Sequence, residues 1–281
     1  MKFTYLGTAA AEGIPAMFCA CDTCKRALSK GGKNYMTRSQ ALVNDNLLID
    51  FGGDTYTHFL SQNKTLSDVE YLIITHSHFD HLDFNEFFCR YETMAYNTKV
   101  EKLKVYMSAV AYNIMQKASE TLKIDFSARD KRFEFIIVEP FKTIDVGEYK
   151  ITPLPAVHAS ENEALLYLIE KDGKSIFYGN DTGIFSEDID NFLLENKKRI
   201  DLLSLDCTKC DVEYNYFTHM SMSEGKKIAE RFEKKNILKP NTKKFYTHFS
   251  HNGGMIYDEM EKVAKEKYDF SVAYDGLCIE L

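Results

Sequence analysis

Three histidines and an aspartate crowd into six residues directly behind a short apolar run. His76, His78, Asp80 and His81 belong to the segment His-Ser-His-Phe-Asp-His, which follows Tyr-Leu-Ile-Ile-Thr at residues 71–75. The apolar run predicts a buried strand, so the polar cluster falls in the loop where that strand ends. So many titratable groups in one loop are costly without a cation, and imidazole with carboxylate suits Zn, Mn or Fe(II). The spacing lets the His-x-His pair face one ion while Asp80 and His81 face a second.

Four of the other histidines also lie at predicted element boundaries. His158 follows Ile-Thr-Pro-Leu-Pro-Ala-Val, His248 and His251 follow Lys-Phe-Tyr-Thr, and His219 precedes Ser221. Loops at strand ends are where sites are usually built, because the sheet holds them rigidly. The last of the eight histidines, His58, follows two glycines in a predicted helix, and we interpret it as a surface or packing residue.

The remaining pattern predicts an α/β fold in a single domain over residues 1–281. Short runs rich in Ile, Val, Tyr or Phe predict strands at 2–6, 40–43, 47–51, 71–75, 104–107, 133–138, 149–153, 165–169, 175–178, 202–205, 244–247 and 271–281. Helical spacing occurs at 85–96, 109–122, 187–196, 222–235 and 255–265. Ser221 followed by Glu224 is a capping-box pattern before the fourth helix. Paired strands followed by alternating strands and helices indicate packed sheets with helices outside.

Charge and hydropathy exclude two classes of partner. The chain has 35 Lys+Arg against 42 Asp+Glu and a formal net charge of −7, so broad, salt-driven nucleic-acid binding is not expected. No apolar run approaches the roughly 20 residues that cross a membrane, so no membrane partner is expected. The N-terminal residues 1–7 are interpreted as a strand rather than a signal segment.

The seven cysteines fall into two groups. Cys19, Cys21 and Cys24 lie within six residues, too close for a set of disulfides, and three thiolates need one more ligand to complete a tetrahedral zinc site. Nothing indicates an oxidising compartment, so we expect a cytoplasmic location. The other four are interpreted as structural: Cys207 and Cys210 as inert packing, Cys89 and Cys278 as core residues.

Taken in order, five segments of the chain resemble the motifs of the metallo-β-lactamase superfamily. They are Leu48–Gly53, Thr75–His81, Leu154–His158, Tyr178–Gly183 and Phe245–His248. The resemblance implies a four-layered αββα sandwich in which two mixed β-sheets are flanked by helices, with a metal centre along one edge.

The resemblance also implies the ligands of two divalent metals, Zn or Mn. One metal would be held by His76, His78 and His158, and the other by Asp80, His81 and His248, with Asp181 bridging the two. Asp80 and Asp181 are thus expected at the reacting centre, where a hydroxide between the ions would be the nucleophile. Asp50 is expected to orient a ligand histidine.

Further segments resemble the PhnP-like cyclic phosphodiesterase branch of this superfamily. That branch binds a structural zinc through an early cysteine cluster and a histidine three residues after the last catalytic one, which implies Cys19, Cys21, Cys24 and His251 here. It also places a His-x-Ser segment beside the metals. This implies that His219 and Ser221 bind the phosphoryl group and that His219 donates a proton to the leaving oxygen.

The expected activity is hydrolysis of a small phosphodiester, such as a cyclic ribose phosphate, by a homodimer. Three alternatives stay open at this point. A tRNA-processing endonuclease of the superfamily is disfavoured by the acidic balance and by the lack of a Gly/Pro-rich arm. A β-lactamase or thioesterase would lack the cysteine cluster. A carrier resembling the pyrroloquinoline-quinone PqqB branch shares that cluster but tends to have a degraded histidine motif, which is intact here.

Overall fold

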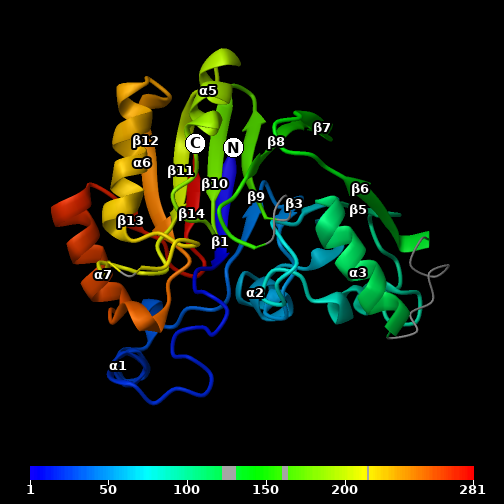
Figure 1. The fold of residues 1–281 in the computed structure, drawn as a ribbon. Helices are drawn as coiled ribbons and strands as arrows, with labels where there is room; N and C mark the ends of the chain where they lie inside the picture. The colour runs from blue at the N-terminus through cyan, green and yellow to red at the C-terminus, as the bar shows by residue number, and fades with distance from the viewer. Residues whose placement is uncertain (122–130, 160–163, 214) are drawn as a thin grey trace.

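Two mixed β-sheets form the centre of the molecule (Figure 1). The structure is a computed structural model that describes residues 1–121, 131–159, 164–213 and 215–281. Each sheet has seven strands, in the orders β14-β1-β2-β3-β4-β5-β6 and β13-β12-β11-β10-β9-β8-β7. The first and last strands of the chain pair with each other, because β1 and β14 are antiparallel neighbours.

The strands of the first sheet are β1 (Lys2–Gly7), β2 (Gln40–Val43), β3 (Leu47–Ile49), β4 (Tyr71–Ile73), β5 (Leu103–Met107), β6 (Phe133–Ile137) and β14 (Cys278–Glu280). Those of the second sheet are β7 (Ile144–Val146), β8 (Tyr149–Pro155), β9 (Leu165–Lys171), β10 (Lys174–Gly179), β11 (Ile200–Asp206), β12 (Leu238–Thr247) and β13 (Ser271–Val272). The helices include α1 (Asp22–Lys30), α2 (Thr55–Ser61), α3 (Ala109–Thr121), α5 (Glu187–Glu195), α6 (Met222–Lys234) and α7 (Tyr257–Val263).

Alternation of side chains along the strands builds three apolar layers. In β3, Leu47 and Ile49 face the space between the sheets, while Leu48 faces outward. In β11, Leu202 faces inward and Leu203 faces outward. Helices α2 and α3 cover the outer face of the first sheet, and α5, α6 and α7 cover that of the second (Figure 1). The predicted αββα arrangement is therefore confirmed. Within the described ranges, no helix is both long and apolar enough to cross a membrane.

Two of the predicted elements differ from the structure in their type or extent. Residues 85–96 are not an α-helix: a 3-10 helix, η3, covers Phe84–Arg90, and turns follow it. Phe87 is the one buried residue of η3 and packs on the rings of Phe51 and Phe133, so a single anchored side chain holds the segment rather than a continuous apolar stripe. The predicted strand 271–281 is two short strands in different sheets, β13 and β14. Gly276, at φ +89°, allows the turn between them.

The cysteine predictions are partly wrong. Cys207 and Cys210 are fully buried in the core that α5, α6 and α7 form with the second sheet, as predicted. Cys89 and Cys278, predicted as core residues, are exposed. Cys278 lies in β14 at the edge of the first sheet, where alternate side chains face solvent, and Cys89 lies in the loosely packed η3.

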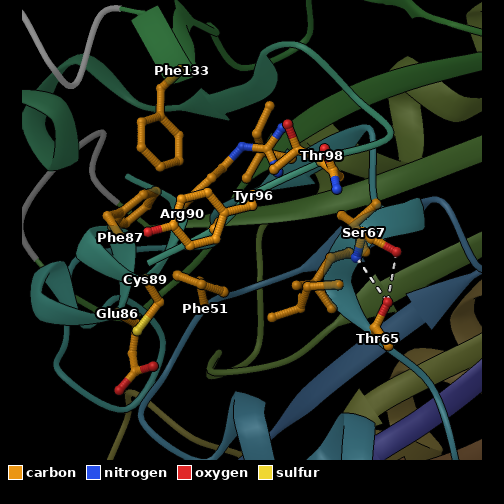
Figure 2. A pocket seen from close by; sticks show the side chains of 16 residues that line it. Phe51, Thr65, Ser67, Glu86, Phe87, Cys89, Arg90, Tyr96, Thr98 and Phe133 are labelled. Atoms are coloured by element: carbon orange, nitrogen blue, oxygen red, sulfur yellow. Dashed lines mark hydrogen bonds between the residues drawn. The ribbon is translucent and has the colours of Figure 1, made fainter. Parts of the chain in front are cut away.

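A separate cavity of about 200 Å³ opens on the outer face of the first sheet (Figure 2). Its walls are mostly apolar and include the rings of Phe51, Phe87, Tyr96 and Phe133. Among the residues described as lining it there is no histidine, so it is distinct from the site built by the histidine motifs.

Candidate metal centre

The predicted histidines and aspartates meet at one edge of the sandwich, because each follows the carboxyl end of a strand. His76 follows β4, His158 follows β8, Asp181 follows β10 and His248 follows β12. Strands β10, β11 and β12 are parallel, and β8 runs with them because β8 and β10 are both antiparallel to β9. Their carboxyl ends therefore lie at the same edge.

His76, His78 and His158 form one group of potential ligands. Nε2 of His76 lies 2.9 Å and Nε2 of His158 lies 3.2 Å from Nδ1 of His78. His76 is fully buried, His158 is partly buried and His78 is exposed. The group is therefore open to solvent on the side of His78 and His158.

Asp80, His81 and His248 form a second group, with Asp181 between the two. The Oδ2 atom of Asp181 lies 2.6 Å from Nε2 of His81 and 3.0 Å from Nε2 of His248. Asp80 Oδ2 lies 3.1 Å from the same His81 nitrogen. The other oxygen of Asp181, Oδ1, is 3.8 Å from Nε2 of His158 in the first group. Asp181 thus has one oxygen toward each group, as a bridging carboxylate requires.

The donor atoms of the second group are placed to bind a cation rather than to form hydrogen bonds with one another. Asp181 Oδ2, His81 Nε2 and His248 Nε2 are buried, and within the described chain none of them has a hydrogen-bond partner despite the short distances. Buried polar atoms without partners are rare in proteins and commonly mark an ion or a water. The geometry therefore fits a metal ligand set.

The number of buried carboxylates around the site also indicates a metal centre. Four carboxylates here are at least 95% buried: Asp50, Asp80, Asp181 and Asp206. In the part of the chain that the structure describes, the basic side chains within 4 Å of these four carboxylates are histidines, with no Lys or Arg. Burial alone would raise the pKa of Asp181, but His248 and His81 hold it well below its usual range. Buried carboxylates of this number are normally paired or coordinate metals.

Two further carboxylates hold the site histidines in place. Asp50 Oδ2 lies 2.7 Å from Nδ1 of His81, the nitrogen opposite the one facing Asp181, as expected for an orienting residue. Asp206 was missed in the sequence analysis. Its Oδ2 lies 2.8 Å from Nδ1 of His219, and its Oδ1 accepts from the backbone N–H of Met220. An aspartate that ends an apolar strand was the available signal.

His219 and Ser221 lie where the chain enters α6. His219 is 8% exposed, and its Nδ1 is 3.6 Å from Oδ1 of Asp181. Ser221 is the N-cap of α6, and with Glu224 it forms the predicted capping box. Because the Ser221 hydroxyl accepts from the backbone of Glu224, its first role is to fix the helix start that carries His219.

The cysteine cluster and His251 form a separate group. One donor atom from each of Cys19, Cys21, Cys24 and His251 lies within 4.8 Å of the others. Cys21 is the N-cap of α1, and its Sγ is 3.4 Å from Nδ1 of His251. The backbone N–H of Cys24, followed by His251, lowers the pKa of the Cys21 thiol to about 6. A tetrahedral zinc site takes a ligand set of this composition.

Comparison with known proteins identifies a matching family and similar solved structures. The Beta-lactamase superfamily domain matches residues 45–249. Comparison with curated proteins gives no match. A diphosphatase from the PhnP family has a TM-score of 0.76 at 19% identity, covering 100% of this chain and 97% of its own. Zn²⁺-bound PqqB from Methylobacterium extorquens has a TM-score of 0.77 at 19% identity, covering 100% of both chains. The short form of human tRNase Z has a TM-score of 0.65 at 16% identity, covering 100% of this chain and 99% of its own. At these identities the likeness shows a shared fold.

Proposed function

Because the chain belongs to the metallo-β-lactamase superfamily, we propose that it is a metal-dependent hydrolase of small phosphodiesters, such as cyclic ribose phosphates. The observation that carries the proposal is the position of Asp181. Its two oxygens face two groups of histidines, which supports a dinuclear centre rather than a single ion. The family match and the buried His/Asp cluster make divalent metal binding the expected chemistry.

The proposed ligands are His76, His78 and His158 for one ion and Asp80, His81 and His248 for the other, with Asp181 shared. When bound, two divalent ions would lower the pKa of a water molecule and stabilise negative charge on phosphoryl oxygens. The protein keeps its ligands in one geometry through their opposite nitrogens, as the contact between Asp50 and His81 illustrates.

His219 is the proposed proton donor to the leaving oxygen. Asp206 accepts a hydrogen bond from Nδ1 of His219, which leaves Nε2 available for the substrate. Nδ1 of His219 is also 3.6 Å from Oδ1 of Asp181, so the ring lies beside the proposed bridging carboxylate, and Nε2 is the nitrogen that would hold the proton for the leaving oxygen.

The fourth part of the proposal is a structural zinc bound by Cys19, Cys21, Cys24 and His251. His251 lies three residues after His248, so the zinc would fix the end of the loop that carries a catalytic-site ligand. In addition, the carboxylate of Glu12 lies 3.9 Å from Nε2 of His251. Nδ1 of this ring therefore faces Cys21, and Nε2 faces Glu12.

The test combines metal analysis with a panel of substrates. Purified protein would be assayed for bound metal and then with bis-p-nitrophenyl phosphate, a ribosyl cyclic phosphate, 2′,3′-cyclic nucleotides, nitrocefin and a pre-tRNA. We expect a dinuclear centre plus one zinc, and hydrolysis of the small phosphodiesters. Hydrolysis of nitrocefin alone would overturn the proposal. Cleavage of pre-tRNA alone would identify a tRNA-processing endonuclease, and one zinc without hydrolysis would identify a carrier.

A further inference from the structure

Two exposed aromatic side chains lie two and three residues before His219 in the sequence. Tyr216 is 55% and Phe217 is 80% exposed, and both lie in the loop between β11 and α6. Large apolar side chains gain free energy when they are buried, and these two forgo that gain. Because they lie next to the candidate metal centre, we ask whether they contact the substrate.

Tyr216 is the outer end of a series of stacked rings that begins inside the centre. His81 stacks on His248 with ring centroids 5.7 Å apart, and His248 stacks on His219 at 5.5 Å. His219 in turn stacks on Tyr216 at 5.5 Å, with the ring planes 20° apart. Tyr216 is therefore held parallel to a site histidine while more than half of its side chain stays accessible.

The loop is also held firmly against the metal-binding segments. Gly183, two residues after Asp181, lies so close to Phe217 that a Cβ at Gly183 would be 1.7 Å from the carbonyl oxygen of Phe217. The next carbonyl, that of Thr218, lies 3.3 Å from Nδ1 of His158. Lys209 Nζ donates to the carbonyl of Tyr216 at 3.2 Å. These contacts hold the backbone of residues 216–218 in place, which lowers the entropic cost of binding.

Tyr216 lies on the side where the centre is open, because it stacks on His219 next to His158, and the exposed Phe217 is its neighbour in the chain. His78 and His158 are its solvent-accessible ligands, and the ring of His158 is 4.8 Å from that of His219. A substrate whose phosphoryl group reaches Asp181 from this side would carry its remaining atoms toward Tyr216 and Phe217.

We propose that Tyr216 and Phe217 form a subsite for a flat ring attached to the phosphodiester, so that the preferred substrates are nucleotides or aryl esters rather than bare sugar phosphates. The proposal rests on the function proposed above and narrows its substrate class. Aromatic side chains recognise any base through its π-face, without hydrogen bonds to the base edge. A substrate without a ring would leave both side chains unused.

The test uses two substrates that differ only in the ring. Adenosine 2′,3′-cyclic phosphate and methyl ribofuranoside 2,3-cyclic phosphate contain the same cyclic phosphodiester, and only the first has a base. For the natural chain we expect kcat/KM to be about tenfold or more higher for the adenosine compound, mainly through KM, which is the size of one base–aromatic stacking contact.

Variants locate the effect. Tyr216→Ala and Phe217→Ala should each remove much of the tenfold preference, mainly by raising KM for the adenosine compound. Tyr216→Phe should keep the preference, because stacking needs the ring and not the hydroxyl. Tyr96→Ala is the control, since Tyr96 is also an exposed tyrosine but lines the separate cavity on the first sheet.

A binding measurement separates this proposal from the proposed function. By calorimetry on metal-loaded protein, AMP should bind at least fivefold more tightly than ribose 5-phosphate, and Tyr216→Ala should abolish the difference. Equal kcat/KM for the two cyclic substrates, with equal binding of the two monophosphates, would overturn the subsite and leave the phosphodiesterase intact. Failure to hydrolyse any phosphodiester would overturn the proposed function, and the substrate class would fall with it. A parallel drop in kcat for both substrates in Tyr216→Ala would instead assign Tyr216 to positioning His219.

Discussion

At the scale of single residues, the site separates side chains that would hold metal from side chains that orient them. Asp181 has an oxygen toward each histidine group, while Asp50 and Asp206 contact the Nδ1 atoms of His81 and His219. A residue of the first kind should change metal content when it is replaced. His219 is not among the proposed ligands, so it should change turnover alone.

Replacing His219 by alanine tests that separation. We expect kcat to fall by about 10²- to 10⁴-fold, the usual contribution of a general acid, with two site metals and one zinc retained. Metal analysis by mass spectrometry alongside steady-state kinetics would measure both quantities. Loss of metal in proportion to activity would show that His219 is a ligand rather than a proton donor.

A second residue-scale feature is a buried chain of hydrogen bonds beside the site. Thr37 Oγ1 lies 2.5 Å from Asp275 Oδ2 and 2.6 Å from Nε2 of His58, whose Nδ1 is 2.7 Å from Gln40 Oε1. The Gln40 amide nitrogen donates to the carbonyl of Asp50, so its oxygen must face His58 and accept from Nδ1. The single Thr37 hydroxyl proton can satisfy either Asp275 or His58. Complete pairing therefore needs one more proton, on one of those two residues.

The two titrations have opposite effects on stability. Burial lowers the pKa of His58 to about 4 from its usual 6.5, so the stability it contributes is present above about pH 6.5 and is lost as the pH falls toward 4. Burial raises the pKa of Asp275 to about 6 from its usual 3.8, so its contribution is present below about pH 3.8 and is lost as the pH rises toward 6. Over this range the two effects offset each other.

Replacing His58 by glutamine should separate the contribution of His58 to stability from that of Asp275. Between pH 7 and pH 4, the free energy of unfolding of the natural chain should fall relative to that of the variant by up to about 3 kcal/mol, because only the natural chain must bury a neutral His58. Urea unfolding at several pH values would measure it, and the shared metal site cancels in the comparison. Parallel pH curves for the two proteins would contradict the buried, neutral state of His58.

At the scale of elements, the turn after β3 and the histidine loop after β4 depend on each other. The backbone N–H of Phe51 donates to the carbonyl of His81 at 2.7 Å, and that of Asp83 donates to the carbonyl of Phe51 at 2.8 Å. Gly52 packs so tightly on this loop that a Cβ would lie 2.1 Å from the carbonyl oxygen of Asp80. The missing side chain of one glycine thus allows Asp80 and His81 to reach the centre.

Gly52→Ala should displace the loop by about 1 Å and lower activity by about 100-fold, together with the affinity for one of the two site metals. The neighbouring Gly53→Ala is the matched control, because a Cβ there would meet its nearest atom at an ordinary 3.6 Å. The control should stay within about 0.5 kcal/mol of the natural chain in stability. Equal behaviour of the two variants, by kinetics and metal titration, would argue against the contact between turn and loop.

Element boundaries also show where local sequence was insufficient. The capping box at Ser221 was predicted correctly because both partners lie within one helical turn. Helix α1 was not predicted, since it begins inside the cysteine cluster, with Cys21 as its N-cap. The segment after Asp83 was predicted as an α-helix on its spacing, but contacts with the rings of Phe51 and Phe133 hold a 3-10 turn instead.

At the scale of the whole molecule, the candidate metal sites join parts of the chain that are far apart in sequence. The cysteine group ties the start of α1 to the loop after β12, and the histidine groups join both sheets. Cations bound there should therefore stabilise the native state over the unfolded chain by several kcal/mol.

Chelation should show this directly. Removing all metals should lower Tm by on the order of 10 °C, as expected from sites occupied far above their dissociation constants in a chain of this size. Cys24→Ser should lose one equivalent of zinc and part of that shift. Cys278→Ser serves as control, because Cys278 is exposed and belongs to no metal-binding group in the described part of the chain. A Tm unaffected by chelator, measured by calorimetry, would contradict a structural role for the cations.

The sequence by itself determined an α/β fold of packed sheets, and its resemblance to the superfamily implied the αββα sandwich and the residues that would cluster. Strand patterning and the position of most site histidines behind apolar runs are local properties, and the fold brings strand ends to a common edge. The tertiary structure alone decided the contact of Asp206 with His219, the stacking of Tyr216, the exposure of Cys89 and Cys278, and the division of residues 271–281 between two sheets. Each of these features depends on contacts between distant segments or on where a sheet ends. The spacing of neighbouring residues determines neither such contacts nor the edge of a sheet.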